Sequence, residues 1–154
     1  MTKILFVCHG NICRSPMAEF VFLDMIKKRH IEDAFVVDSA ATSTEEIGNP
    51  VHHGTVSILR KMGVACGEHR AVQLKRSDYE RYDLIIGMDE ANRRNIMRIL
   101  GSDPDSKVCL LLDFSDRPRD IADPWYTGDF TCSYNDIVEG CTALLNYLEK
   151  NPEV

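Results

Sequence analysis

One segment near the start of the chain constrains the fold more than any other. Four apolar residues, Ile4 to Val7, are followed by a polar stretch from Cys8 to Ser15 and then by an apolar, helix-periodic run from Met17 to Ile26. The first run predicts a buried parallel strand and the second predicts a helix. Ser15 is a suitable N-cap, and Pro16 suits the first helical position. The polar loop between them is a place where backbone N–H groups and a helix N-terminus can surround an anion.

This loop carries a pair of chemically reactive groups. Cys8 stands at the predicted end of the strand, and Arg14 stands at the start of the helix. A thiol that faces a guanidinium indicates a nucleophile directed at a phosphate-sized cavity. Gly10 and Asn11 suit the tight turn between them. Spacing alone leaves one alternative open, a buried strand-end cysteine beside a solvated arginine.

Length, charge and cysteine content limit the class of protein. The 154 residues suit a single domain, which we expect to span residues 1–154. The net charge of −6 argues against nucleic acid as the main partner. We expect no membrane insertion, because no apolar run approaches transmembrane length, and the apolar start is too short for a signal peptide. Six cysteines without a secretion signal predict reduced thiols and a cytoplasmic location.

Strand-like and helix-like segments alternate along the chain. After the first helix we predict a strand, helix, strand, helix, strand and helix at 34–39, 50–62, 83–88, 90–100, 107–112 and 134–150. Such alternation predicts a parallel sheet with helices on both faces. Ligands bind these sheets beyond the carboxyl ends of the strands. We therefore expect the loops that begin at Cys8, Ser39, Asp89 and Asp113 to meet at one edge.

The long loop from Asp113 to Thr131 holds a candidate acid. Asp123 precedes Pro124, which favours an extended backbone, and Trp125 and Tyr126 follow. A carboxyl group at the same edge as a nucleophile can protonate a leaving group. The two rings can stack on an aromatic substrate. Alone, the segment also fits an ordinary Asp-Pro surface turn, but its predicted position at the edge of Cys8 favours the acid.

Together these two segments resemble the low-molecular-weight protein tyrosine phosphatase family, from about Lys3 to Lys150. The loop matches the family's Cys-x5-Arg-Ser signature directly after the first strand. Asp123-Pro124 matches its general-acid motif near the C-terminus. The resemblance implies an α/β fold, a single-domain three-layer α/β/α sandwich whose four-stranded parallel sheet has the strand order 2-1-3-4.

The resemblance also implies a reaction, the hydrolysis of phosphotyrosine in proteins and of small aryl phosphates through a cysteinyl-phosphate intermediate. Cys8 is then the nucleophile, Arg14 clamps the phosphate, and Asp123 is the general acid and base. The residues expected to bind the phosphate or substrate are His9, Gly10, Asn11, Ile12, Cys13, Ser15, Trp125 and Tyr126.

Several loop residues carry finer expectations from the same resemblance. The Ser15 hydroxyl is expected to donate a hydrogen bond to the Cys8 sulfur, which makes the Cys8 thiolate a better leaving group. Asn11 matches an asparagine that holds the loop in shape, and Ser39 and His69 match its partners, although each also suits an ordinary turn, strand-end or loop position. Cys13 matches a second loop cysteine that can form a disulfide with the nucleophile. We hypothesise that this pairing protects the nucleophile from further oxidation.

No cofactor and no metal are expected. The adjacent His52 and His53 would point apart on a helix and so could not bind one ion. The expected partners are phosphotyrosine-containing proteins, with phosphate and other tetrahedral oxyanions as inhibitors. The chain is expected to be a monomer or a weak dimer.

Two positions bear on the choice of substrate. Glu45 stands where many relatives carry an aromatic residue, so one wall of the pocket rim is expected to be acidic. This predicts weaker selectivity for aromatic phosphates and poorer binding of acidic phosphopeptides. Ile12 stands where relatives that hydrolyse phosphoarginine carry threonine, which favours phosphotyrosine as the substrate.

Three other functions would use a similar architecture. A thioredoxin-coupled arsenate reductase needs two further redox cysteines after the third strand, and Asp89 to Ser106 contains none. A phosphocysteine carrier of the sugar-transport type has no use for Arg14 or Asp123. A non-catalytic phosphate-binding module would keep its function after Cys8→Ser.

Overall fold

The strands form one parallel sheet that matches the predicted topology. The computed structural model describes residues 1–152, so the last two residues of the predicted 1–154 domain lie outside the described range. Within it, four strands pair in the order β2-β1-β3-β4. They are β1 (Thr2–Cys8), β2 (Phe35–Ala41), β3 (Leu84–Gly87) and β4 (Val108–Leu110). The α/β class and the strand order 2-1-3-4 are confirmed.

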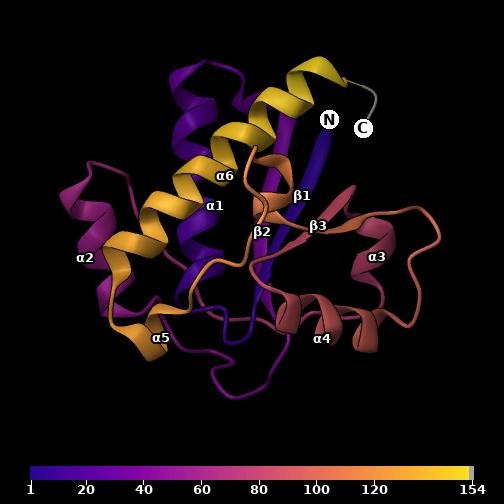
Figure 1. Cartoon of the computed structure of the whole chain (residues 1–154), viewed down its shortest axis with the longest axis horizontal. Coiled ribbons are helices and arrows are strands. Elements are labelled where there is room, and N and C mark those ends of the chain that lie inside the picture. Colours follow the sequence, from indigo (N-terminus) through magenta and orange to yellow (C-terminus); the bar gives the residue numbers. More distant parts are fainter. Residues whose placement is uncertain (153–154) are drawn as a thin grey trace.

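Helices cover both faces of this sheet, as the alternating pattern predicts. In Figure 1, α6 crosses over α1 on one side of the strands, and α3 and α4 lie on the other side. The helices are α1 (Arg14–Lys28), α2 (His53–Lys61), α3 (Asp78–Arg81), α4 (Glu90–Leu100), α5 (Pro124–Thr127) and α6 (Phe130–Lys150), with 3-10 turns η1 (Glu32–Ala34) and η2 (Leu111–Phe114).

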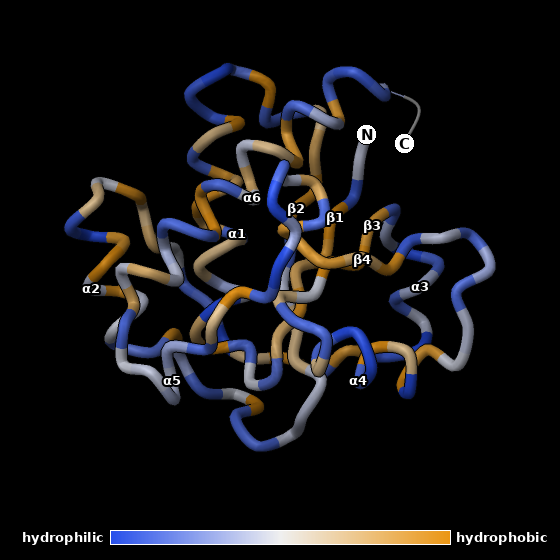
Figure 2. Tube along the Cα trace, viewed as in Figure 1, coloured by the Kyte–Doolittle hydropathy of each residue, from blue (hydrophilic) through white to orange (hydrophobic). Residues whose placement is uncertain are grey.

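Strand β1 lies at the centre of the sheet and is buried on both faces. Ile4 and Phe6 belong to the core formed with α1 and α6, whereas Leu5 and Val7 belong to the core formed with α4. This alternation follows from the two-residue period of a strand. Figure 2 shows the strands as mostly hydrophobic and the outer turns as mostly hydrophilic. A continuous apolar run in the sequence therefore marked a central strand correctly.

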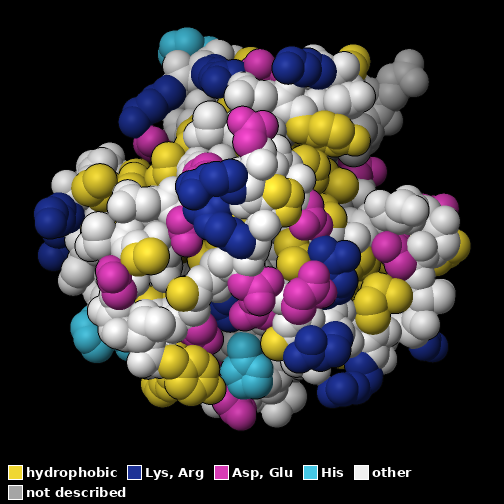
Figure 3. Space-filling view, viewed as in Figure 1, with side chains coloured by type: hydrophobic (Ala, Val, Ile, Leu, Met, Phe, Trp, Pro, Cys, Tyr) yellow, Lys and Arg dark blue, Asp and Glu magenta, His cyan; other side chains and the backbone are white. Residues whose placement is uncertain are grey.

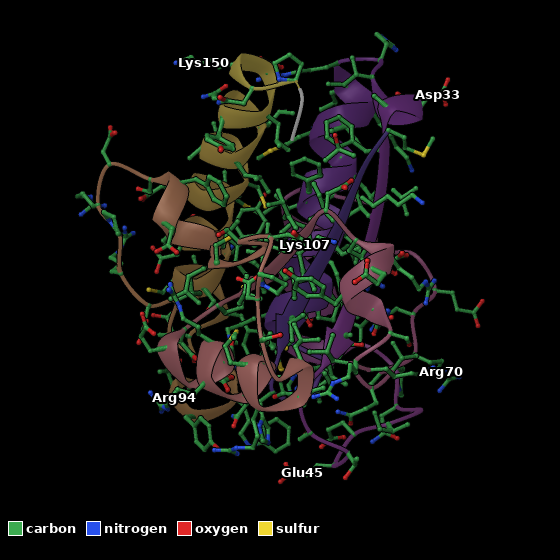
Figure 4. The ribbon with its side chains drawn as sticks, turned by 90° about the vertical axis from the view of Figure 1, so that its right-hand side faces the viewer. Asp33, Glu45, Arg70, Arg94, Lys107 and Lys150 are labelled. Carbon is green, nitrogen blue, oxygen red and sulfur yellow. The ribbon has the colours of Figure 1, made fainter. Side chains whose placement is uncertain are left out.

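The parallel register brings the ends of the strands to one edge. Cys8, the last residue of β1, lies opposite Ala41 of β2, while Val7 lies opposite Gly87 of β3. The loops that follow these strands consequently begin beside one another. Figure 4 shows Glu45, in the loop after β2, at this end of the molecule.

Three predicted helix boundaries need correction. The helix predicted to start at Pro50 starts at His53, because Pro50 forms an isolated bridge with Arg70 and His52 becomes the N-cap. The last helix starts at Phe130 rather than at 134, capped by the Asp129 carboxylate. The first helix starts at Arg14, so Ser15 does not cap it; the Ser15 hydroxyl instead contacts the Cys8 sulfur.

The predicted strand at 107–112 is too long at its C-terminal end. It ends at Leu110, and Leu111 and Leu112 form the 3-10 turn η2 with both side chains fully buried. The Asp113 carboxylate closes the turn by accepting a hydrogen bond of 2.9 Å from the Leu110 amide. A buried run of leucines carries no signal that separates a strand from a tight turn. The short helices α3 and α5 were not predicted, since four residues show no helical period.

Within residues 1–152, no helix is both long enough and apolar enough to cross a membrane.

Candidate functional site

Hydrogen-bond donors surround the Cys8 sulfur at the end of β1. The backbone amides of Asn11 and Ser15 lie 3.3 and 3.4 Å from this sulfur, and the Ser15 hydroxyl oxygen lies 3.0 Å from it. The Cys8 residue is only 3% exposed. Three hydrogen-bond donors therefore converge on a sulfur that is almost fully buried.

Asn11 is the structural centre of the loop that follows Cys8. It is fully buried and has a φ of 58°, in the left-handed region that asparagine tolerates better than most residues. Its side-chain amide donates to Ser15 Oγ at 2.8 Å and to Ser39 Oγ at 2.9 Å. Its side-chain oxygen accepts a hydrogen bond of 3.1 Å from the Val72 amide. His69 Nε2 lies 3.1 Å from the Asn11 carbonyl oxygen. The structure thus brings Asn11, Ser39 and His69 together.

Sequence analysis missed one further member of this network, Glu19 of α1. Ser39 Oγ accepts from the Asn11 side-chain amide, which can only donate, and it donates to Glu19 Oε1 at 2.5 Å. Ser15 Oγ likewise accepts from Asn11, which leaves its own hydrogen free to point at the Cys8 sulfur. Glu19 lies one helical turn after Ser15, and that spacing is the only signal the sequence offered.

The guanidinium of Arg14 is buried and held from three sides. The side chain is 2% exposed, and Nη1 donates to Asp89 Oδ2 and to the Ile121 carbonyl, each at 2.8 Å. Nη2 lies 3.4 Å from Asp123 Oδ2. Burial alone would lower the pKa of Arg14, but Cys8, Asp89 and Asp123 outweigh it and raise the pKa. Arg14 therefore carries a fixed positive charge in the interior.

The sequence predicted that Asp89 lies at this edge of the sheet, but it assigned the residue no role. One of its carboxylate oxygens caps α4 by accepting 2.7 Å from the Asn92 amide, and the other accepts from Arg14. The residue therefore joins the start of α4 to the guanidinium. Its place directly after β3 was visible in the sequence, but its partner came from a segment 75 residues away.

Asp123 contacts Nη2 of the guanidinium, whereas Asp89 and the Ile121 carbonyl contact Nη1. The Asp123 backbone is extended, with φ −83° and ψ 113°, as the following Pro124 favours. One carboxylate oxygen caps α5 by accepting 3.0 Å from the Trp125 amide, and the other faces Arg14. The hydrogen bond to the Trp125 amide and the contact with the buried Arg14 guanidinium together fix the orientation of the Asp123 carboxyl group.

These groups open into one small pocket of about 80 Å³. Trp125 and Tyr126, 56% and 82% exposed, form its aromatic side, and Glu45 stands at the rim with its carboxylate 3.0 Å from His9 Nε2. Figure 3 shows hydrophobic side chains over α5 at the lower edge of the molecule. The residues around the pocket are Cys8, His9, Gly10, Ile12, Cys13, Arg14, Glu45, Glu46, Asp123, Trp125 and Tyr126.

Cys13 lines the same pocket as Cys8 but differs in character. It is 5% exposed, and burial, followed by the nearby Cys8 and Asp123, raises its pKa to about 12. Cys13 therefore remains a protonated thiol at neutral pH.

The two histidines of the α2 region do not point apart, so that expectation was wrong. Because His52 lies before the helix as its N-cap, its ring stacks on that of His53 with centroids 4.2 Å apart. Among the described residues, no group of three or more His, Cys, Asp or Glu side chains is arranged to hold a metal ion.

Comparison with known proteins shows the family to which the chain belongs. A family model described as low molecular weight phosphotyrosine protein phosphatase matches residues 3–154. The chain belongs to this phosphatase family. It is accordingly an enzyme of the protein tyrosine phosphatase class.

The similar proteins of the phosphatase family span bacteria and animals. The chain is 38% identical to the low molecular weight protein-tyrosine-phosphatase YfkJ of Bacillus subtilis, with all of both chains covered. It is 40% identical to the Gallus gallus phosphatase, over 93% of each chain. The crystal structure of YfkJ superposes with a TM-score of 0.94, covering 98% of this chain and 96% of YfkJ. A Drosophila arginine phosphatase superposes at 0.86 with 30% identity, covering 95% of this chain and 97% of the other.

Asn11→Ala tests the hydrogen-bond centre of the phosphatase loop. The variant loses the side-chain bonds to Ser15 and Ser39, leaves the Val72 amide unpaired and places alanine at a positive φ. We expect it to lower the free energy of unfolding by about 2–4 kcal/mol in urea titrations. His30→Ala is the matched control, because His30 has a φ of 57° but is exposed; it should cost only about 1 kcal/mol. Equal losses would show that the network contributes nothing.

Proposed function

We propose that the chain hydrolyses phosphotyrosine in proteins, and small aryl phosphates, through a cysteinyl-phosphate intermediate on Cys8. One observation carries the proposal. The Cys8 sulfur, the buried Arg14 guanidinium and the Asp123 carboxyl line a single pocket, although they come from widely separated segments. A nucleophile, a phosphate clamp and an acid in one pocket are the parts that metal-free phosphoryl transfer needs.

The first half-reaction transfers the phosphoryl group to sulfur. The Cys8 thiolate attacks phosphorus in line with the ester oxygen, so that an S–P bond forms while the P–O bond to the tyrosine breaks. Asp123, protonated at this stage, gives its proton to the departing phenolate. This role is supported by the position of the Asp123 carboxyl, which lines the same pocket as Cys8 and contacts Arg14 through Oδ2.

Arg14 binds the transferred group throughout the reaction. Its guanidinium can grip two equatorial oxygens side by side, which is a geometry that lysine cannot reproduce. Asp89 and the Ile121 carbonyl hold Nη1 in place before the substrate arrives, which limits the reorganisation required in the transition state. The loop of His9, Gly10, Asn11, Ile12 and Cys13 surrounds the remaining oxygens.

The second half-reaction releases inorganic phosphate. Asp123 is now a carboxylate and takes a proton from a water molecule, whose oxygen attacks phosphorus while the S–P bond breaks. The electron pair returns to Cys8, and the Ser15 hydroxyl, 3.0 Å away, stabilises the departing thiolate by donating a hydrogen bond. The enzyme then returns to its starting state, and free phosphate competes with substrate as an inhibitor.

The pocket favours an aromatic ester over phosphoarginine. Trp125 and Tyr126 offer rings on which a tyrosine can stack, and Ile12 provides an apolar contact in the loop. Phosphoarginine is the second candidate, because a structural neighbour is an arginine phosphatase. The acidic rim formed by Glu45 and Glu46 disfavours acidic phosphopeptides.

The wider setting follows from the same chemistry. We assign the reaction to one domain over residues 1–154, acting in the cytoplasm on phosphotyrosine-containing proteins as a monomer or weak dimer, without nucleic acid, cofactor or metal. An arsenate reductase is disfavoured, because Asp89 to Ser106 lacks the two further cysteines. Arg14 and Asp123, facing each other in the pocket, serve no purpose in a phosphocysteine carrier.

Cys13 provides a protective reaction for the nucleophile. Hydrogen peroxide oxidises Cys8 to a sulfenic acid, and the Cys13 thiol then attacks that sulfur to form a disulfide with loss of water. A cellular thiol reduces the disulfide and restores the enzyme.

Asp123→Asn tests the acid. Phenyl phosphate needs a protonated leaving group, and so its kcat/KM, which covers only the steps up to phosphoryl transfer to Cys8, should fall about 10²- to 10⁴-fold. For p-nitrophenyl phosphate, whose phenolate leaves without a proton, the fall in kcat/KM should be much smaller, whereas kcat should fall for both substrates because they share the hydrolysis of the intermediate. Asp120→Asn in the same loop is the control and should leave both rates close to those of the parent. Cys8→Ser should abolish both activities. An equal loss of kcat/KM for the two substrates in Asp123→Asn would contradict a role as general acid.

Ile12→Thr tests the choice between phosphotyrosine and phosphoarginine. We expect the parent to favour phosphotyrosine in kcat/KM and the variant to gain activity on phosphoarginine, because a hydroxyl replaces an apolar contact in the loop. Release of inorganic phosphate from both substrates measures the ratio. Parent activity that already favours phosphoarginine would overturn the assignment.

A further inference from the structure

His52 connects the phosphate loop to helix α2. Its backbone amide donates to the Ile12 carbonyl at 2.8 Å, and its ring Nδ1 accepts a hydrogen bond of 3.0 Å from the Gly54 amide. The first contact holds the loop that lines the pocket. The second satisfies one of the free amides at the start of α2. The same residue therefore joins two segments through its backbone and its side chain.

The His52 ring also fills the space between α2, α5 and α6. It stacks on Phe130 of α6 with centroids 5.2 Å apart and an interplanar angle of 18°, and it meets Trp125 of α5 edge-on at 5.6 Å and 77°. A side chain at Gly54 would lie 2.4 Å from the Phe130 ring, so the packing there is close. In Figure 1, α2 lies at the left of the molecule and α5 at the lower left, both next to the end of α6 at which that helix begins.

We propose that His52, in its neutral form, is a positioning residue that holds Trp125 as the aromatic wall of the substrate pocket. The proposal rests on the proposed function and deepens it, because it assigns the recognition of the phosphotyrosine ring to a contact outside the pocket. His52 does not line the pocket itself. It acts through Trp125, which does, and through Ile12, whose carbonyl it binds.

The hydrogen-bond pattern requires a neutral imidazole. Because Nδ1 accepts from the Gly54 amide, it carries no proton, and the ring proton is on Nε2. Burial, followed by the adjacent His53, lowers the pKa of His52, while Glu46 acts in the opposite direction. Trp125 of α5 and Phe130 of α6 touch the ring, and neither side chain titrates. The titratable residues next to them are Asp123 and Asp129, the N-caps of those two helices.

Acidification should therefore loosen the aromatic wall. A protonated Nδ1 would be a hydrogen-bond donor pointing at another donor, the Gly54 N–H. The ring would then have to leave its position. The pKa of His52 is lower in the folded state than in the unfolded chain. As the pH falls below about 6.5, the unfolded chain therefore takes up this proton before the folded protein does. The stabilising contribution of His52 is complete above that pH and is lost as the pH falls towards the folded-state pKa.

The chain contains a single tryptophan, Trp125, whose fluorescence reports on this contact directly. We would record its emission from pH 8 to pH 5 in the parent, His52→Asn, His52→Phe and the control His53→Asn. Asparagine can still cap α2 but lacks the ring, and phenylalanine keeps the ring but cannot titrate. The parent and His53→Asn should show a one-proton transition in emission, and both His52 variants should lack it.

Kinetics with an aryl phosphate supply the functional readout. His52→Asn should raise KM about threefold to tenfold at pH 7 with kcat changed less than twofold, because a pair of rings is lost away from the reacting atoms. His52→Phe should keep, as the pH falls, the KM that the parent has at pH 7. Unchanged KM and an unchanged fluorescence titration in His52→Asn would overturn the proposal. A fluorescence transition that depends on His52 in a protein without phosphatase activity would uphold the contact and reject the proposed function instead.

Discussion

The site depends on a positive charge that the fold holds in its interior. Arg14 is almost fully buried, and a charge removed from water must find compensating partners nearby. The partners come from the start of α4, through Asp89, and from the segment before α5, through the Ile121 carbonyl and Asp123. The guanidinium therefore gathers three loops at the carboxyl edge of the sheet. The pocket that results holds this guanidinium in place before any ligand enters it.

A second network holds the nucleophile in relation to that charge. The Asn11 side-chain amide donates to both Ser39 and Ser15, so the Ser39 hydroxyl donates to Glu19 and the Ser15 hydrogen is free to point at the Cys8 sulfur. Side-chain networks of this kind stiffen a site because every buried polar group is satisfied only in one arrangement. The aromatic side of the pocket is less constrained. Trp125 and Tyr126 are largely exposed, and the ring of His52 is the contact that supports the tryptophan.

Much of this arrangement could be predicted from the sequence, for reasons that local patterns explain. The run from Ile4 to Val7 marked a strand buried on two faces, and Glu90 to Leu100 had helical periodicity and a glycine stop, which the structure confirms. Partnerships between distant segments left no local pattern, as in the contacts of Glu19 and Asp89. Leu111 and Leu112 are as apolar as a strand but lie in a turn closed by Asp113. The stacking of His52 on His53 was not predicted, because α2 begins at His53, three residues later than the predicted start at Pro50.

The central claim is that the phosphoryl group passes through Cys8, and a rapid-quench experiment tests it most directly. Asp123→Ala keeps the nucleophile but lacks the base that activates water, so the intermediate should accumulate with p-nitrophenyl phosphate as substrate. Acid quenching, proteolysis and mass spectrometry would then locate the bound phosphate. The account predicts a phosphorylated peptide with the group on the Cys8 sulfur, formed at the rate at which nitrophenol is released. Release of nitrophenol with phosphate on another residue, or on none, would contradict it.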